Sequence, residues 1–126
     1  MKPSTQARLT VGRFLHGLRV RRGLSLRKLG RATGMSATYI SRIENGTYLF
    51  PAQYTQDFVK ALGISGKEQH VFYDMLSIAR ENRFEDIDEY LSRNSQARYC
   101  IRLIMLQEDP ASVWDQILQL LNDTKR

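Results

Sequence analysis

The sequence contains little of what several large classes of protein require. It has 126 residues and one cysteine, Cys100, so no disulfide can form within the chain and a reducing compartment is expected. No run of about 18 apolar residues occurs, so no membrane-spanning segment is predicted. The first residues also lack the apolar block of a secretory signal. We therefore expect a cytoplasmic protein, with Cys100 as a small core residue because it lies in an apolar helical stretch.

The groups that catalysis or metal binding would need are also scarce. The two histidines, His16 and His70, lie in separate predicted helices with no nucleophile or acid at a recognisable spacing. There is no glycine-rich phosphate loop and no Cys/His pattern of a metal site. The acidic residues between positions 85 and 89 lack the glycine and the spacing of a calcium loop. We therefore predict that the protein is not an enzyme and binds no cofactor or metal.

Basic residues, by contrast, are abundant and unevenly distributed. The net charge is +6, made up of +9 over residues 1–63 and −3 over residues 64–126. A strongly basic half beside a mildly acidic half indicates a polyanionic partner for the first half only. A basic surface that is simply solvated would give the same charge distribution, so the charge alone does not identify a polyanionic partner and a motif is needed.

Apolar residues at helical spacing run along the whole chain, and no strand alternation occurs, so the fold is predicted to be all-α. Five helices are expected in the first two-thirds, the fourth of them from Ala52 to Leu62 after Pro51. Three shorter helices follow within residues 87–91, 97–106 and after Pro110. The composition changes near residues 80–83. We therefore predict a DNA-binding domain over residues 1–81 and a C-terminal helical segment over residues 82–126.

The segment 25–46 predicts two short helices joined by a tight turn at Gly34, an arrangement that can present one helix to the major groove of DNA. Ile40 and Ile43 would anchor the second helix from behind. The opposite face is predicted to contact bases, and it carries Ala37, Thr38, Ser41 and Arg42. Arginine can donate two hydrogen bonds to guanine, and alanine can contact a thymine methyl. Threonine can donate or accept a hydrogen bond and can offer its own methyl group to thymine.

A second set of residues is expected to contact the phosphate backbone. Ser36 and Tyr39 carry hydroxyls near the start of the second helix, where free N–H groups also favour phosphate. Arg27 and Lys28 lie in the first turn of the preceding helix, where cations oppose the helix dipole. That local cost is easier to understand if a phosphate approaches, although two exposed cations can also be of no consequence.

These residues resemble the helix-turn-helix of the lambda-repressor/XRE-type family. The matching positions are Leu18-Arg19, Gly23-Leu24-Ser25, Leu29, Gly34-Met35-Ser36, Ile40-Ser41, Ile43-Glu44-Asn45-Gly46, Pro51 and Ala61-Leu62-Gly63-Ile64. The resemblance covers roughly residues 9–80 and implies a five-helix domain, from a prokaryote or a phage, that binds operator DNA as a two-fold dimer. It also implies that Asn45 contacts the DNA backbone and that Arg19 and Glu44 form a partly buried ion pair. Leu26 departs from the pattern, because the family often has a phosphate-binding glutamine there. Its side chain cannot form a hydrogen bond, and it could pack inward or touch a sugar.

We therefore predict a sequence-specific transcriptional regulator, most commonly a repressor, that binds double-stranded DNA through the major groove and associates with the nucleoid when bound. A palindromic operator would be bound by a homodimer formed through the apolar stripe Trp114, Ile117, Leu118 and Leu121. Two alternatives stay open for the C-terminal helices. They could cap the core of the first domain, or bind another protein as in an antitoxin-like regulator. A ligand-sensing pocket between them is disfavoured, because about 45 residues leave little volume for one. The apolar loop 48–50 could likewise pack locally or contact a partner subunit.

Overall fold

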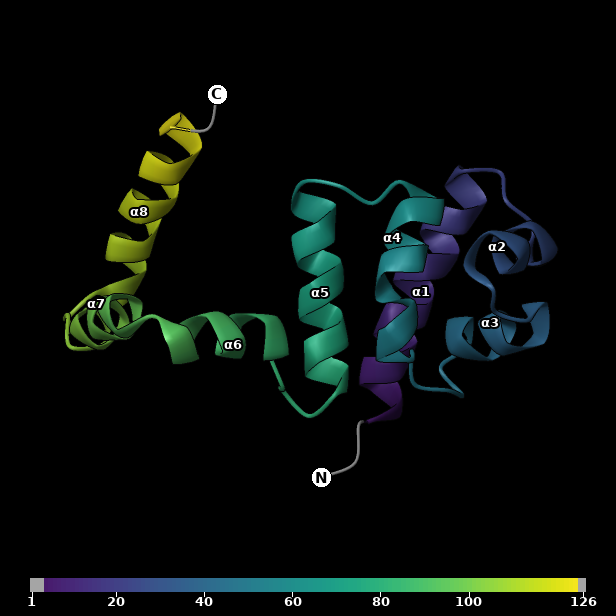
Figure 1. Ribbon diagram of the computed structural model, residues 1–126, viewed down its shortest axis with the longest axis horizontal. Helices are drawn as coiled ribbons and strands as arrows, with labels where there is room; N and C mark the ends of the chain where they lie inside the picture. The colour runs from purple at the N-terminus through teal and green to yellow at the C-terminus, as the bar shows by residue number, and fades with distance from the viewer. Residues whose placement is uncertain (1–3, 125–126) are drawn as a thin grey trace. The chain divides into compact units, whose positions relative to one another are not determined.

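The structure is a computed structural model that describes residues 4–124, in which helices joined by turns and loops are the only regular secondary structure (Figure 1). Its elements are α1 (Thr5–Arg21), α2 (Leu26–Thr33), α3 (Ala37–Glu44), the short 3-10 helix η1 (Ala52–Tyr54), α4 (Thr55–Leu62), α5 (Lys67–Ala79), α6 (Glu85–Arg93), α7 (Ser95–Met105) and α8 (Pro110–Thr124). The all-α prediction is confirmed. None of the helices described is long and apolar enough to cross a membrane.

The chain divides into two compact units between Phe84 and Glu85. We call them the N-terminal unit, which holds α1 to α5, and the C-terminal unit, which holds α6 to α8. The separate roles expected for residues 1–81 and 82–126 stay a prediction.

The helix-turn-helix begins and ends at the residues that its local chemistry predicts. The Ser25 Oγ atom accepts a hydrogen bond from the Lys28 backbone N–H at 3.1 Å and caps α2. The Ser36 Oγ atom accepts from the Tyr39 N–H at 3.1 Å and caps α3 in the same way. Between them, Gly34 has a φ of 79°, a left-handed conformation that glycine adopts without steric cost. Ser25, Gly34 and Ser36 therefore set where α2 begins, where it ends and where α3 begins.

One continuous apolar core holds the N-terminal unit together. Helix α1 packs against α3 and α5, and α2 packs against α3 and α4. Phe50, Phe58 and Phe72 lie at its centre, where the Phe50 ring meets the other two edge-on at centroid distances of 4.9 and 5.6 Å. Phe50 is buried, so this residue of the 48–50 loop packs locally, while Tyr48 and Leu49 are exposed. Aromatic pairs in this geometry add to the stabilisation that burial provides.

The segment after Pro51 differs from its prediction in one respect. A single α-helix was expected from Ala52 to Leu62, but its first turn is the 3-10 helix η1. The Tyr54 N–H donates to the Pro51 carbonyl at 3.1 Å, which is the i to i+3 pattern of a 3-10 turn. No side chain caps η1 or α4, so the tighter turn serves to satisfy the backbone there.

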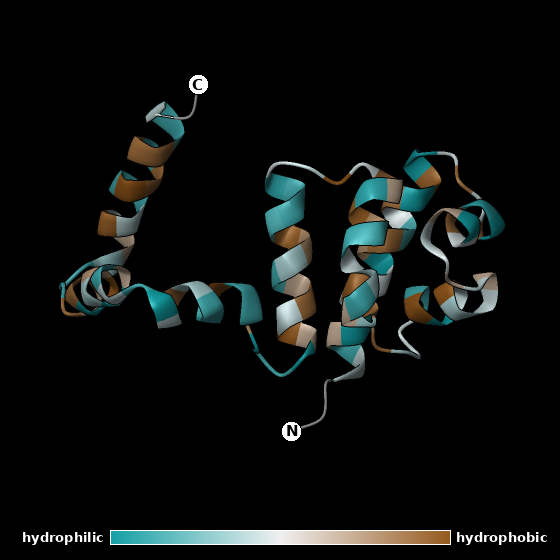
Figure 2. Ribbon diagram, viewed as in Figure 1, coloured by the Kyte–Doolittle hydropathy of each residue, from teal (hydrophilic) through white to brown (hydrophobic). Residues whose placement is uncertain are grey.

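The C-terminal unit is much less well buried. Of its described residues, only Ile104 is buried, at 8% relative exposure. Helix α8 carries several exposed hydrophobic residues, and Figure 2 shows brown residues recurring along it. Cys100, expected in the core, is exposed. The prediction was wrong because α7 lacks the packing partners that would bury the face on which Cys100 lies.

Candidate nucleic-acid interface

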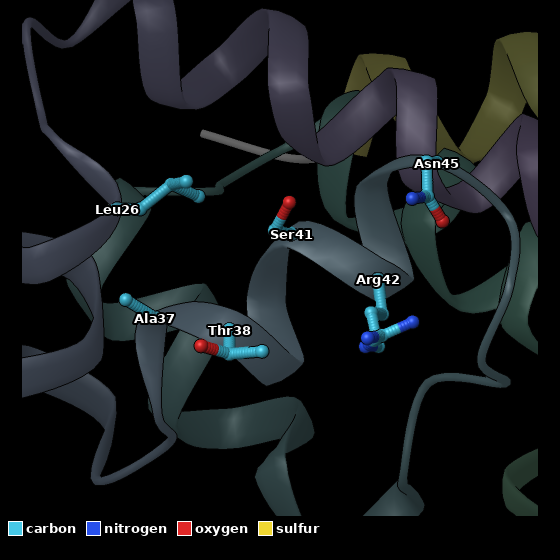
Figure 3. Close-up of a pocket in the computed structure, with 6 residues that line it drawn as sticks. All are labelled: Leu26, Ala37, Thr38, Ser41, Arg42 and Asn45. Atoms are coloured by element: carbon cyan, nitrogen blue, oxygen red, sulfur yellow. The ribbon is translucent and has the colours of Figure 1, made fainter.

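A surface pocket between α2 and α3 brings the predicted base-contacting residues together. It has a volume of about 420 Å³ and is lined by Leu26, Ala37, Thr38, Ser41, Arg42 and Asn45 (Figure 3). We call it the α2–α3 pocket. All four predicted base-contacting residues line it, and so does Asn45. Leu26, Ala37 and Ser41 are half-buried, whereas Thr38, Arg42 and Asn45 are exposed. We call the three half-buried residues the floor of the pocket and the three exposed ones its rim.

The Arg42 side chain lies against an aromatic ring. Its guanidinium carbon is 5.7 Å from the centre of the Tyr48 ring, within the range of a cation–π contact. The Tyr48 ring in turn meets the ring of Tyr39 at a centroid distance of 4.9 Å. Among residues 4–124, no acidic side chain pairs with Arg42. Its charge is therefore held near the pocket by an aromatic ring that leaves the guanidinium donors available.

The predicted backbone-contacting residues surround the start of α3 in two further pockets. Arg27 and Arg31 of α2 line one of about 490 Å³, together with Ser36 and Ala37. Tyr39 and Ser36 line another of about 380 Å³, with Gly34, Met35, Pro51, Gln53 and Tyr54. Lys28 is exposed but lines none of these three pockets. The start of α3 therefore has cations on one side and hydroxyl groups on the other.

Asn45 is ordered by its own chain. Its Oδ1 atom accepts hydrogen bonds from the Thr47 N–H at 3.0 Å and from the Thr47 hydroxyl at 2.6 Å. The oxygen is thereby used within the turn after α3. The side-chain NH2 group is the part of Asn45 that suits an acceptor such as a phosphate oxygen.

Arg19 and Glu44 form the ion pair that the resemblance implies. The Arg19 Nε atom donates to Glu44 Oε2 at 2.7 Å and its Nη2 atom donates to Oε1 at 2.9 Å, so the pair is bidentate. A third member is His16, whose Nδ1 atom lies 2.8 Å from Glu44 Oε1. The side chains of Arg19 and Glu44 are only 12% and 9% exposed. The three residues tie the end of α3 to α1.

The ionisation of this pair favours the charged forms. Burial by itself raises the pKa of Glu44, but the hydrogen bonds from Arg19 and His16 outweigh it and leave the pKa below its usual value. The hydrogen bond to Glu44 likewise raises the pKa of Arg19. Both groups are therefore charged at neutral pH, and the cross-link between α1 and α3 is at full strength.

A close backbone approach places α3 against α1. Ile40 and Ile43 are each 1% exposed and form the buried side of α3. Opposite them, Gly12 lies so close to α3 that a Cβ atom there would overlap the carbonyl oxygens of Ile43 and Glu44. Only glycine allows this contact. The backbones of α1 and α3 are therefore already in contact at Gly12, so α3 cannot move closer to α1 and its polar face stays exposed.

Four residues that lie at or beside the site, Leu26, Arg31, Tyr48 and His16, were not predicted to belong to it. The helical spacing of Arg27 and Arg31, four residues apart, was a signal for a shared face. The same holds for His16 and Arg19, three apart on α1. The contact of Tyr48 depends on how elements pack, and no sequence pattern indicates it. For Leu26 the signal was the resemblance, which places this residue where the family often has a phosphate-binding glutamine.

Residues 10–71 match the family model of a helix-turn-helix domain. The match covers just under half of the chain, from early α1 into α5, and includes every residue predicted to contact DNA. It is consistent with a helix-turn-helix DNA-binding family, whose domains are typically non-enzymatic, and it suggests a DNA-binding regulator. No curated protein and no solved structure matches the chain.

Proposed function

We propose that the protein is a sequence-specific transcriptional regulator of the lambda-repressor/XRE type that binds a palindromic operator as a homodimer. Helix α3 enters the major groove, and repression by occlusion of the promoter is the expected mode. The observation that carries this proposal is the α2–α3 pocket, in which Ala37, Thr38, Ser41 and Arg42 lie together with no acidic lining residue. Helix α3 is backed by a buried core, so it can approach DNA as a rigid element.

In this proposal the pocket reads bases and its surroundings bind phosphate. Arg42 bridges O6 and N7 of a guanine, and Thr38 and Ser41 hydrogen-bond to neighbouring base edges. Arg27 and the start of α3 bind one phosphate, and the hydroxyls of Ser36 and Tyr39 bind another. Asn45 donates its NH2 group to the backbone beyond α3, and Lys28 adds charge without a fixed contact. The net charge of +9 over residues 1–63 supports binding of this half of the chain to DNA.

The C-terminal unit is proposed to form the dimer. Trp114, Leu118 and Leu121 are 44%, 59% and 60% exposed, and Ile117 beside them is half-buried. Exposure of such an apolar stripe to water is unfavourable, and exposed apolar patches often mark sites where another protein binds. A second copy of the same stripe covers both in a two-fold arrangement. Two recognition helices would then meet major grooves about 34 Å apart.

The proposal is tested by selecting bound sequences from random double-stranded DNA with the full chain. Two inverted, related half-sites are expected, with centres about 10 base pairs apart. Arg42→Ala should abolish base preference at one position in each half-site, at a cost of about 1–3 kcal/mol. Arg27→Ala should weaken binding to all sequences alike, and the logarithmic salt slope should fall by about 0.9 for each phosphate that the variant no longer neutralises.

A matched charge control is Arg93→Ala, which removes a basic residue of the C-terminal unit that pairs with Glu89 at 3.1 Å. Its salt slope should equal that of the wild type. Identical behaviour of the Arg42 and Arg27 variants on every sequence would contradict the division into base readers and phosphate binders. Failure to enrich any sequence would contradict the DNA-binding proposal itself.

The same exposed stripe on α8 supports a second candidate, in which the C-terminal helices bind another protein, as an antitoxin-like regulator would. Sedimentation equilibrium separates the two. A homodimer should weaken on Trp114→Ala or Leu118→Ala and be unchanged on Gln119→Ala, which alters the other side of α8. A monomer at all accessible concentrations would favour the heterologous partner.

A further inference from the structure

We propose that the α2–α3 pocket reads the 5-methyl group of a thymine, and that Leu26 is the residue that makes this reading selective. This inference rests on the proposed DNA-binding function and names part of its specificity. Leu26 belongs to α2, which braces the recognition helix, and yet it lines the same pocket as the residues of α3 that face DNA.

The floor of the pocket has an apolar part. Leu26 and Ala37 cannot form side-chain hydrogen bonds, and both are half-buried. In Figure 3 the Leu26 side chain extends from α2 toward α3, where Ser41 lies opposite it. Leu26 also packs against the core of the N-terminal unit, so its position is constrained from below. Its remaining surface and Ala37 form a fixed apolar wall, and the other residues that line the pocket are polar.

The chemistry of the major groove narrows what can meet such a wall. All four bases present hydrogen-bond donors or acceptors there, and thymine alone adds a methyl group, at C5. A donor or acceptor pressed against Leu26 and Ala37 would lose its water without gaining a partner, which is unfavourable. A methyl group loses nothing and gains the burial of apolar surface. The apolar part of the pocket is therefore complementary to a thymine methyl and unfavourable for the other bases.

The polar rim sets where this thymine lies. Arg42 stands on α3 one turn beyond Thr38, and the contact with Tyr48 holds its guanidinium near the rim. Arg42 and Leu26 line the same pocket, so the guanine that Arg42 contacts and the thymine that Leu26 contacts belong to neighbouring base pairs. Each half-site should therefore contain a thymine close to the guanine whose recognition depends on Arg42.

Deoxyuridine tests this directly, because it differs from thymidine only by the missing methyl group. With the operator selected by the full-length wild-type protein, each thymine of a half-site is replaced singly by deoxyuridine, and the dissociation constant is measured at one salt concentration. One position per half-site should weaken binding about fourfold, which corresponds to burial of one methyl group. Thymines outside that position should tolerate the replacement.

The variants then assign the effect to a residue. Leu26→Ala should abolish the difference between thymidine and deoxyuridine at that position, and Leu26→Gln should do the same while keeping the size of the side chain. Leu24→Ala is the matched control, since Leu24 also packs half-buried against the core but does not line the pocket. It should retain the full fourfold difference. Thermal unfolding of each variant shows whether the domain is intact.

The outcomes distinguish this inference from the function on which it rests. Wild-type protein that binds its selected operator equally well with deoxyuridine at every thymine position overturns the role of Leu26 and leaves DNA binding intact. A deoxyuridine effect that persists in both Leu26 variants also overturns it. Absence of any specific double-stranded DNA binding by the wild type overturns the proposed function itself. The decisive measurement uses the wild type, so misfolding of a variant cannot obscure it.

Discussion

The two units of this chain treat their apolar residues in opposite ways. The N-terminal unit buries three phenylalanines and a surrounding set of aliphatic residues almost completely, whereas the C-terminal unit buries Ile104 alone among its described residues. Both contain amphipathic helices of ordinary length. The difference is that α1, α3, α4 and α5 have neighbours on their apolar faces, and α8 exposes Trp114, Leu118, Leu120 and Leu121. An amphipathic helix is therefore not evidence of a core, and the exposed apolar residues of α8 are the ones that the proposed dimer would cover.

The largest effect expected from this comparison is the loss of stability that follows removal of a central aromatic side chain. Phe72→Ala should lower the free energy of unfolding of the N-terminal unit by about 3–5 kcal/mol, because Phe72 is fully buried and contacts both Phe50 and Phe14. Leu118→Ala should leave that free energy within about 0.5 kcal/mol of the wild type. Amide hydrogen exchange of α1 and α5 under native conditions measures it for one unit at a time. Equal losses in both variants would contradict the independence of the two units.

The next effect concerns how α1 holds α3. Gly12→Ala should cost about 1–3 kcal/mol of stability, because the new methyl group would overlap backbone carbonyls that cannot rotate away. It should also weaken DNA binding, since α3 must shift. Gly17→Ala on the same helix is the matched control. Its Cβ would meet only the end of the flexible Arg21 side chain, at 3.9 Å.

Gly17→Ala should therefore be stabilising by about 0.4–1 kcal/mol, as is usual where glycine is replaced in an unstrained helix. Urea unfolding of the two variants, followed by circular dichroism, provides the comparison. A neutral Gly12→Ala would mean that α3 is less firmly seated than its contacts indicate.

The smallest of the three effects is a dependence on pH. The pKa of Glu44 is lower in the folded protein than in the unfolded chain, where it is about 4.3. Its contribution to stability is therefore complete above that value and is lost as the pH falls through the folded pKa. Glu44→Gln should be less stable than the wild type at pH 7 and should lose less stability between about pH 5 and pH 3. Thermal unfolding across this range measures the slope.

Glu68→Gln provides the control for general charge effects. Glu68 is partly exposed. Its Oε1 atom lies 3.7 Å from Arg22 Nη2 and its Oε2 atom lies 3.9 Å from Arg21 Nη2, distances typical of weak surface ion pairs. This variant should keep the acid response of the wild type. An unchanged slope in Glu44→Gln would show that the ion pair with Arg19 does not govern acid sensitivity.

The elements of the fold were largely predictable because their signals are local. Ser25 and Ser36 each cap a helix by accepting a hydrogen bond from an N–H three residues ahead, and Gly34 adopts the conformation that ends α2. Such interactions span three or four residues and are written in the sequence itself. The 3-10 turn after Pro51 was missed because the same residues suit either type of first turn, and the choice depends on packing.

The candidate site was predictable only in part. Helical spacing correctly grouped Ala37, Thr38, Ser41 and Arg42 on one face of α3, and these four residues line one pocket. Whether they contact DNA stays a prediction. Spacing along one helix cannot reveal what a second helix contributes, so it assigned no role in the site to Leu26, and it did not find the contact between His16 and Glu44, which lie 28 residues apart.

By itself the sequence determined the helical class, the positions of the caps, the outward face of α3 and the concentration of positive charge in the first half. These properties depend on neighbours within one helical turn or on simple counting. The tertiary structure alone decided that Gly12 seats α3 on α1, that Leu26 forms a wall of the pocket, and that Cys100 is exposed. The reason is physical: distances between helices are set by close packing of many side chains at once, and no local pattern encodes that sum.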